Sequence, residues 1–204
     1  GSETLTNTNL STFDNKNVGS NKTVTVNSIT LSDGTNGGLA ANYSISPGQT
    51  TTANITAKAL TVSGITASNK IYDGNTTATL NTGSVTYNGL IAGDVFDGIY
   101  TGTFSDKNVE TGKIVTINTI YNGIDVGNYS VTNQSTATGN IVPKTLTATA
   151  SASNKVYNGD RTATTTLTLS GLIGSETLNS TNTSTFNNKN AGTNKPVTVN
   201  SITL

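Results

Sequence analysis

The sequence repeats itself at long range, and this repetition constrains the fold more than any other feature. Residues 1–31 match residues 174–204 at 24 of 31 positions, with an offset of 173 residues. A third and more divergent copy lies between them, so we interpret the offset as two periods of about 86 residues each. Repetition at a fixed period is typical of chains that use one structural unit several times.

Short motifs align the copies with one another. An F-x-x-K-N motif begins at Phe13, Phe104 and Phe186, and a second lysine follows the first by six residues in every copy. The segment 67–74 contains K-x-Y-D-G and returns at 152–159 with K-x-Y-N-G. Because the motifs keep the same order, we expect the copies to share one fold.

These motifs also predict the domain boundaries, and the chain is cut out of phase with its repeat. The predicted parts are the C-terminal part of one repeat at 1–57, a complete repeat at 58–143, and the N-terminal part of the next repeat at 144–204. The chain contains no Met. We therefore expect it to be an internal piece of a longer protein.

The local pattern predicts strands rather than helices. Apolar and polar residues alternate with a period of two, as in 24–26 and 60–62, and no segment keeps a period of 3.6. Thr, with 42 of 204 residues, also favours strands. Segment 95–100 is expected to form a tight hairpin. Asp-Gly and Asn-Gly pairs predict turns at 33–34, 36–37, 73–74, 88–89, 97–98, 122–123 and 158–159.

The fold class expected from these patterns is all-β. The turn spacing predicts roughly six or seven strands per repeat. Since a single sheet would leave one apolar face in water, each repeat is expected to be a small β-sandwich-like domain, Ig-like or β-grasp-like. Short connections between tandem repeats predict an elongated rod, to which each copy adds about 35–45 Å.

Composition excludes several classes of function. The chain has no His and no Cys, which removes the Ser-His-Asp and Cys-His nucleophiles, the thiolate zinc sites and the disulfides. Eleven basic residues balance eleven acidic ones, so nothing favours nucleic acid as a partner. The sequence contains no run of 18 apolar residues, so we expect no direct membrane insertion. We expect no enzyme activity, no cofactor and no metal.

The motifs K-x-Y-[DN]-G, F-x-[DN]-K-N and G-N-Y together resemble the YDG-type repeat of bacterial surface proteins, which is often found in filamentous-haemagglutinin-like adhesins. The resemblance covers the full period and therefore essentially the whole chain. It implies export to the cell surface and tandem β domains in a stalk or filament, and it implies no catalytic residue. The second copy reads Tyr157-Asn158-Gly159. Asn replaces Asp there, which favours a turn over a metal-binding role.

Three tyrosines are the candidate ligand-contact residues. Tyr87, Tyr100 and Tyr121 occur in the central copy only, and Tyr100 aligns with Asn182. Their absence from other copies predicts exposed side chains, and exposed aromatic rings can stack on sugars or anchor a partner. The alternative is ordinary packing between neighbouring strands.

Acidic residues recur at one position of the repeat, as Glu3, Asp94 and Glu176. A calcium ion would need six to eight oxygen ligands, and no EF-hand-like string is present, so a turn or solvated carboxylate is the preferred interpretation. A carboxylate pair for glycoside cleavage, an ice-binding face of Thr rows, and Lys–Asn isopeptide crosslinks are further alternatives. Asn-x-Ser/Thr sites occur about as often as chance predicts and indicate nothing about glycosylation.

Together these patterns predict a structural role. The expected function is a stalk or filament segment of a bacterial cell-surface adhesin, outside the cell, whose β repeats project a distal functional region. The alternative is that the repeat itself adheres to glycan, matrix or like repeats on other cells. The expected partners are neighbouring repeats of the same chain, and other copies through strand exchange or filament assembly.

Overall fold

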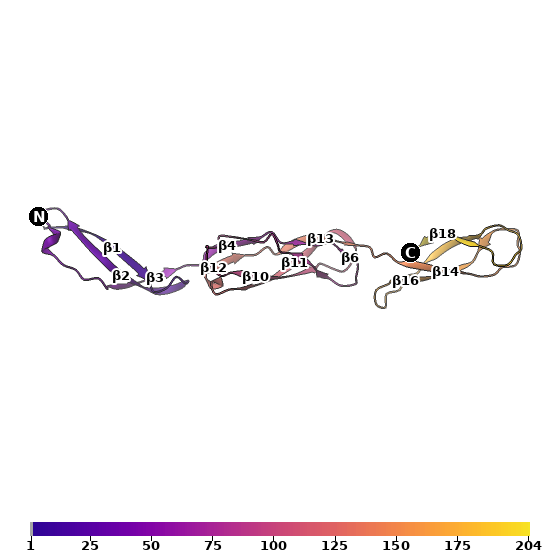
Figure 1. Ribbon diagram of the computed structural model, residues 1–204, viewed down its shortest axis with the longest axis horizontal. Helices are drawn as coiled ribbons and strands as arrows, with labels where there is room; N and C mark the ends of the chain where they lie inside the picture. The colour runs from indigo at the N-terminus through magenta and orange to yellow at the C-terminus, as the bar shows by residue number, and fades with distance from the viewer. Residues whose placement is uncertain (1) are drawn as a thin grey trace. The chain divides into compact units, whose positions relative to one another are not determined.

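The structure, a computed structural model, describes residues 2–204 and confirms the all-β prediction (Figure 1). No α-helix occurs in that range; the helical elements are two short 3-10 turns, η1 and η2. The first strands are β1 (Leu5–Phe13) and β2 (Gly19–Asp33), followed by η1 (Ala40–Asn42) and β3 (Thr50–Ile55).

The middle of the chain contains many short strands. They are β4 (Lys58–Ser63), β5 (Thr66–Ala67), β6 (Lys70–Ile71), β7 (Thr77–Ala78), β8 (Leu80–Asn81), β9 (Thr86–Asn88), β10 (Asp97–Phe104), β11 (Glu110–Asn122), η2 (Val126–Asn128), β12 (Tyr129–Thr132) and β13 (Thr136–Val142). The last strands are β14 (Thr147–Ala152), β15 (Thr162–Ala163), β16 (Thr165–Ser170), β17 (Thr181–Phe186) and β18 (Val197–Thr203).

The described residues form two compact units. The first comprises 2–66, 80–102 and 117–137, and the second comprises 67–79, 103–116 and 138–204. A five-stranded sheet has the order β6-β13-β11-β10-β7.

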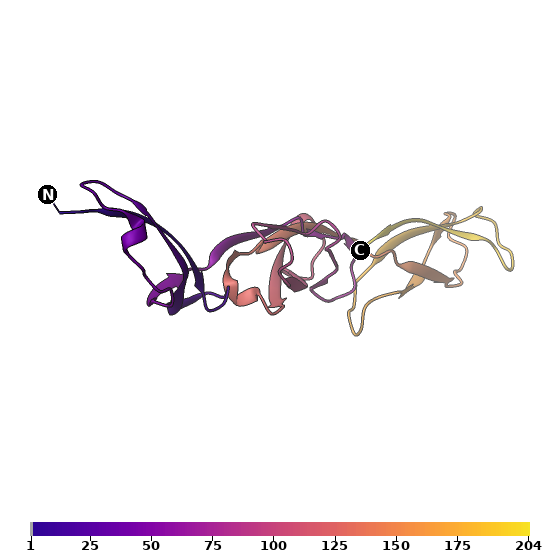
Figure 2. The same cartoon turned by 60° about the vertical axis from the view of Figure 1, so that its left-hand side comes forward.

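In the first unit, β1 and β2 form a long antiparallel hairpin, which appears in indigo in Figure 2, and β3 pairs with the other edge of β2. Strand β4 lies in the centre of a second sheet of order β12-β4-β9. It pairs in parallel with β12 and antiparallel with β9. The parallel pair joins segments about 70 residues apart, which a local sequence pattern does not predict.

In the second unit, β14 pairs with β16, and β17 lies between β15 and β18. The β17–β18 register repeats that of β1–β2. Phe13 faces Val24 and Phe186 faces Val197, and both hairpins have a register shift just before the equivalent residues Ser11 and Ser184. Segments 173 residues apart in sequence therefore have the same local structure.

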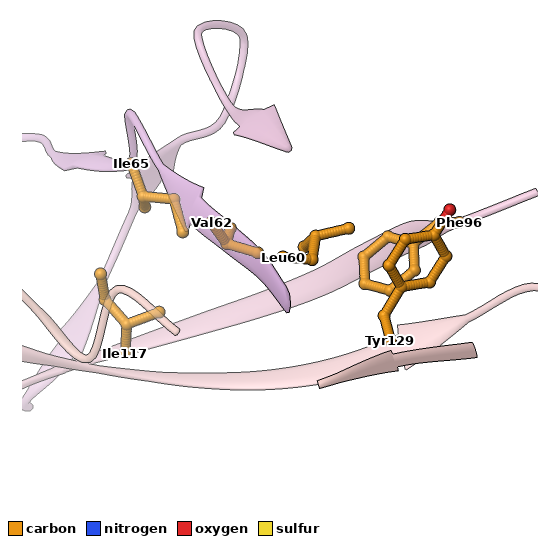
Figure 3. Packing of buried hydrophobic residues seen from close by; sticks show 6 residues of the cluster. All are labelled: Leu60, Val62, Ile65, Phe96, Ile117 and Tyr129. Atoms are coloured by element: carbon orange, nitrogen blue, oxygen red, sulfur yellow. The ribbon is translucent and has the colours of Figure 1, made fainter. Parts of the chain in front are cut away.

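The core of the first unit is formed by alternate residues of its strands. Leu60 and Val62 on β4 point to one side, because successive side chains of a strand face opposite ways. The complete cluster in Figure 3 is Leu60, Val62, Ile65, Phe96, Ile117 and Tyr129. The ring of Phe96 packs edge-on against that of Tyr129 at 5.7 Å between centroids.

In the second unit, Phe104, Val115 and Ile141 are the most deeply buried side chains. Lys113 is also buried, two positions before Val115 on the inner face of β11. Its ammonium group forms ion pairs of 2.8 Å with both Asp106 and Glu110. These pairs compensate the charge that burial removes from water.

Two local predictions need correction. The expected hairpin at 95–100 is absent, because Asp97 and Gly98 begin β10 instead of forming a turn. The preceding Phe96 is held in the core, and the chain continues from it directly into the strand. The range 58–143 contains ten strands rather than six or seven, because several of them have only two residues. Other predicted turns are confirmed by glycines with positive φ, as at Gly37, Gly89 and Gly123.

Candidate functional site

The three candidate tyrosines lie together, but as part of the core rather than as exposed rings. Tyr87, Tyr100 and Tyr121 are half-buried and pack against the cluster of Figure 3. Tyr87 packs edge-on against Phe96 at 5.3 Å between centroids, and Tyr121 lies 4.9 Å from the same ring. The rings of Tyr87 and Tyr121 thus pack around Phe96, and the three tyrosines are half-buried rather than exposed as predicted.

Their hydroxyl groups are engaged as well. The hydroxyls of Tyr87 and Tyr100 are 3.1 Å apart, and that of Tyr121 donates to Oδ1 of Asn133 at 2.6 Å. Burial, followed by the hydrogen bond to Tyr87, raises the pKa of Tyr100. These rings contribute packing area and satisfied hydrogen bonds, which is the arrangement expected for tyrosines in a small core.

A different set of residues forms the most specific polar cluster of the first unit. The ammonium group of Lys16 lies 2.7 Å from Asp94 and 2.7 Å from Asp125. Lys16 belongs to the first F-x-x-K-N motif, whereas both aspartates belong to the predicted central repeat. The aspartate side chains are only 10% and 4% exposed, whereas that of Lys16 is 63% exposed.

Backbone and amide groups extend this cluster. The Val18 amide donates to Oδ1 of Asn128 at 2.9 Å, and Nδ2 of Asn128 lies 3.3 Å from Oδ1 of Asn17. Asp125 also accepts the Val95 amide at 2.9 Å. The segment 16–18 is therefore held through one side-chain charge, one side-chain amide and one backbone amide.

A tyrosine hydroxyl also donates a hydrogen bond to the recurrent carboxylate, which is Asp94 in one copy and Glu3 in another. Tyr129 donates to Asp94 at 2.6 Å, and in the N-terminal segment Tyr43 donates to Glu3 at 2.7 Å. The two tyrosines are equivalent in the repeat, and so are the two acids. The same tyrosine–acid pair is thus formed twice with different carboxylates.

The second unit contains a corresponding cluster around Glu176. Lys107, from the second F-x-x-K-N motif, donates to Glu176 at 3.1 Å. The hydroxyl of Tyr72, from K-x-Y-D-G, donates to the same Oε1 atom. These residues line a cavity of about 520 Å³ together with Ile173.

Gly74 and Ile173 approach each other closely in this cluster. Gly74 has φ of 79°, and a Cβ atom at this position would lie 2.8 Å from Cγ2 of Ile173. Both the backbone conformation and the contact therefore require glycine. Gly159, the equivalent residue of the next copy, has φ of 86° and open space around it.

The ion pairs shift the titration of the carboxylates toward the charged form. The hydrogen bonds from Lys16 and Tyr129 lower the pKa of Asp94, and those from Lys16 and the Val95 amide lower the pKa of Asp125. The hydrogen bonds from Tyr72 and Lys107 lower the pKa of Glu176. The paired lysines have raised pKa values for the same reason. All five charges are therefore present at neutral pH.

A comparison with protein families matches the YDG domain to residues 1–53, 56–138 and 142–204. The chain belongs to the YDG domain family. Searches of curated proteins and of solved structures found no match. The Tyr72-Asp73-Gly74 segment, which carries the letters of the YDG name, supplies both the tyrosine hydroxyl on Glu176 and the glycine against Ile173.

Two further findings concern residues 2–204 only. No group of three or more side chains of the metal-ligating types is placed to hold a metal ion. No helix in this range is long and apolar enough to cross a membrane.

The sequence alone identifies residues of these clusters but not which of them contact one another. The recurrence of Lys16, Lys107, Asp94 and Glu176 at fixed positions is visible in the sequence, but the pairing of each lysine with a carboxylate about 70 to 80 residues later is not. The signal that could have found it is joint recurrence: both residue types return in each copy although charged residues are only 11% of the chain. Asp125 has no such signal, since its equivalent position appears with Asp in one copy only.

Proposed function

We propose that this YDG domain chain is a structural segment of a bacterial cell-surface protein of the filamentous-haemagglutinin-like adhesin type. In this proposal, repeats of about 86 residues follow one another outside the cell and form a stalk or filament that projects a distal functional region. The resemblance of the motifs supports the surface location, and the all-β composition without His or Cys suits a part whose role is mechanical.

The observation that carries the proposal is the recurrent lysine–carboxylate contact. Lys16 and Lys107 occupy the same position of the F-x-x-K-N motif, and each binds the acid that follows a G-L-I segment of the next predicted copy, Asp94 or Glu176. A stalk needs such contacts, since domains linked by a bare peptide move independently. Each contact is polar and uses the lysine of an F-x-x-K-N motif, so the same contact can recur wherever the motif recurs along a chain.

The proposal is tested by removing the contacts without touching either core. In the double variant Lys16→Ala and Lys107→Ala, we expect ¹⁵N relaxation to show predicted repeats that tumble independently, whereas in the unchanged protein they share one anisotropic rotation. Lys58→Ala removes an exposed lysine elsewhere and is the matched control. Identical relaxation in the double variant and the unchanged protein would argue that the contacts have no mechanical role.

The adhesive alternative is separated from the stalk by a binding experiment. The packing of Tyr87, Tyr100 and Tyr121 against the core supports a structural role for these rings. We therefore expect the isolated 204-residue chain to show no saturable binding to glycan arrays or to cells. Saturable binding that is lost in the triple Tyr→Phe variant, which keeps the rings and removes the hydroxyls, would favour the adhesive function instead.

A further inference from the structure

The second lysine that follows each F-x-x-K-N motif contacts the side chain seven residues before it. The contacts are Lys22 with Oδ1 of Asn15 at 2.6 Å, Lys113 with Oδ2 of Asp106 at 2.8 Å, and Lys195 with Oδ1 of Asn188 at 2.5 Å. Each copy therefore places an amine against the carbonyl group of an Asp or Asn side chain, in the loop of its own hairpin.

Two of these lysines are shielded from water. The side chain of Lys113 is 1% exposed, and it precedes the fully buried Val115 on the inner face of β11. The equivalent side chain of Lys22 is 9% exposed. Keeping a charged amine out of water costs free energy even when it is paired, so its conversion to a neutral amide is favoured.

A backbone amide polarises the carbonyl group that each of these lysines faces. The Asn108 amide donates to Oδ1 of Asp106 at 2.7 Å, and the Asn17 amide donates to Oδ1 of Asn15 at 3.0 Å. A donor at this place stabilises the negative charge that develops on the oxygen when an amine adds to Cγ. Because Cγ is bonded to the oxygen that the lysine contacts, it lies within about 4 Å of Nζ, near the separation from which bonds form.

A second carboxylate reaches the same ammonium group in two of the copies. Oε2 of Glu110 lies 2.8 Å from Nζ of Lys113, and Oδ1 of Asp14 lies 3.0 Å from Nζ of Lys22. Such a carboxylate can accept a proton from the attacking amine and return it to the leaving group. These two hairpins therefore combine a nucleophile, a polarised carbonyl carbon and a group that transfers protons.

The third copy lacks the equivalents of these carboxylates. Asn187 stands at the position of Asp14, and Gly192 stands at the position of Glu110. Lys195 thus meets the side-chain amide of its hairpin loop without either of the acids that the other copies supply. The chain contains its own comparison between hairpins with and without the acid.

We propose that, where this acid is present, the lysine becomes joined to the carbonyl carbon by an intramolecular isopeptide bond. The two bonds connect Lys113 to Asp106 and Lys22 to Asn15. Lys195, which has no such acid, stays unlinked. The proposal concerns the chemistry of single hairpins and does not rest on the proposed function.

The reaction in the central hairpin needs no further reactant. Glu110 accepts a proton from the ammonium group of Lys113, and Nζ then adds to Cγ of Asp106. The Cγ–Oδ2 bond breaks, and Oδ2 leaves as water with two protons from the ammonium group. The ion pair becomes a neutral amide, so both atoms and charge balance.

The reaction in the first hairpin differs in its leaving group. Asp14 takes the role of the proton-transferring acid, and Nζ of Lys22 adds to Cγ of Asn15. The Cγ–Nδ2 bond breaks, and the side-chain nitrogen leaves as an ammonium ion with two protons from the lysine. The positive charge of the lysine thus departs with the leaving group.

The mass of the intact, purified chain tests the proposal. We expect it to be lower than the mass of the sequence by about 35 Da, of which about 18 Da is water lost at Lys113 and about 17 Da is ammonia lost at Lys22. An unshifted mass would overturn the proposal.

Peptide mapping distinguishes the bond from a succinimide, which loses the same mass. Trypsin does not cleave after an acylated lysine, so the bond at Lys113 leaves residues 71–107 joined to residues 108–144 in one branched peptide. The same loss of mass confined to unbranched peptides would overturn the proposal.

Removing the acids tests their role. Glu110→Gln changes a side chain that is 59% exposed, so we expect an unchanged fold by circular dichroism and no loss of water at Lys113. Asp14→Asn is expected to abolish the loss of ammonia at Lys22 in the same way. Lys58→Arg, which changes a lysine outside both hairpins, is the matched control and keeps both losses. Full losses in the two acid variants would overturn the proposal.

Supplying an acid to the third copy is the converse test. Asn187 is exposed, and Asn187→Asp gives this copy the acid that Asp14 provides in the first. We expect an additional loss of about 17 Da and a new branched peptide that joins Lys195 to Asn188. A variant without this additional loss would overturn the proposal that the acid decides where the bond forms.

Discussion

Lysine illustrates how context decides the role of a residue in this chain. Lys113 is buried and pairs with Asp106 and Glu110 of its own hairpin, and the equivalent Lys22 pairs with Asp14 at 3.0 Å. Lys16, six residues before Lys22, points outward to carboxylates far along the chain. The buried Lys113 thus pairs within its own hairpin, whereas the exposed Lys16 joins segments that are distant in sequence.

The carboxylates of these contacts predict how stability depends on pH. Asp94 and Asp125 have pKa values below the ordinary 3.8, and Glu176 has a pKa below 4.5. A group whose pKa is lowered by folding stabilises the folded state above its unfolded pKa, and this contribution disappears as the pH falls through the folded pKa. We expect the free energy of unfolding to be level near neutral pH and to decrease below about pH 4.5.

Variants assign this decrease to particular groups. Asp94→Asn and Glu176→Gln are expected to be less stable at pH 7 and to lose less stability between pH 7 and pH 3, measured by chemical denaturation. Asp97→Asn is the matched control, since that carboxylate contacts the hydroxyl of Tyr87 rather than a lysine. If the free energy of unfolding of Asp94→Asn depends on pH in the same way as that of the unchanged protein, the Lys16 contact is not the source of the decrease at low pH.

A comparison of the two glycines of the Y-[DN]-G motif distinguishes the cost of backbone strain from the cost of a steric contact. Gly74→Ala and Gly159→Ala both place a side chain at positive φ, at a cost of about 1–2 kcal/mol. Only Gly74→Ala also pushes a methyl group into Ile173, which adds about 1–3 kcal/mol. We expect thermal unfolding at a distinctly lower temperature for Gly74→Ala. Equal melting temperatures would mean that the Ile173 contact is not maintained in solution.

At the scale of strands and sheets, the sequence predicts local structure well and long-range pairing poorly. Asn88-Gly89 and Asn122-Gly123 are turns, as predicted, because glycine provides the positive φ that such turns need. The parallel pairs β4–β12 and β6–β13 are not predicted, since neither strand carries a mark of its partner. The packing of Tyr87 on Phe96 is missed for the same reason.

Two equivalent phenylalanines differ in burial, and we expect them to differ in their contribution to stability. Phe104 is 2% exposed, whereas the equivalent Phe13 is 39% exposed. We expect Phe104→Ala to reduce the free energy of unfolding by about 3–5 kcal/mol, which is usual for a buried ring. Phe13→Ala is expected to cost less than half as much in denaturant titrations at low protein concentration. Equal losses would show that the burial of the ring does not decide its contribution to stability.

At the scale of the whole molecule, the composition and the polar contacts point to the same role. Thr and Asn make up 70 of 204 residues, and they supply water-facing strand positions and turns rather than a large core. Small cores joined by lysine–carboxylate contacts suit a chain that extends by adding copies, because each copy needs only its neighbours. The stalk proposal rests on this composition and on these contacts.

Small-angle X-ray scattering of the unchanged chain, extrapolated to zero concentration, tests the stalk most directly. A compact protein of this length has a radius of gyration of about 17 Å. If the 204 residues, about 2.4 predicted repeats, add about 35–45 Å per repeat, the maximum dimension is about 85–110 Å and the radius of gyration about 25–30 Å. We predict the larger values. A radius of gyration near that of the compact protein would contradict the proposal that this chain is a segment of a stalk.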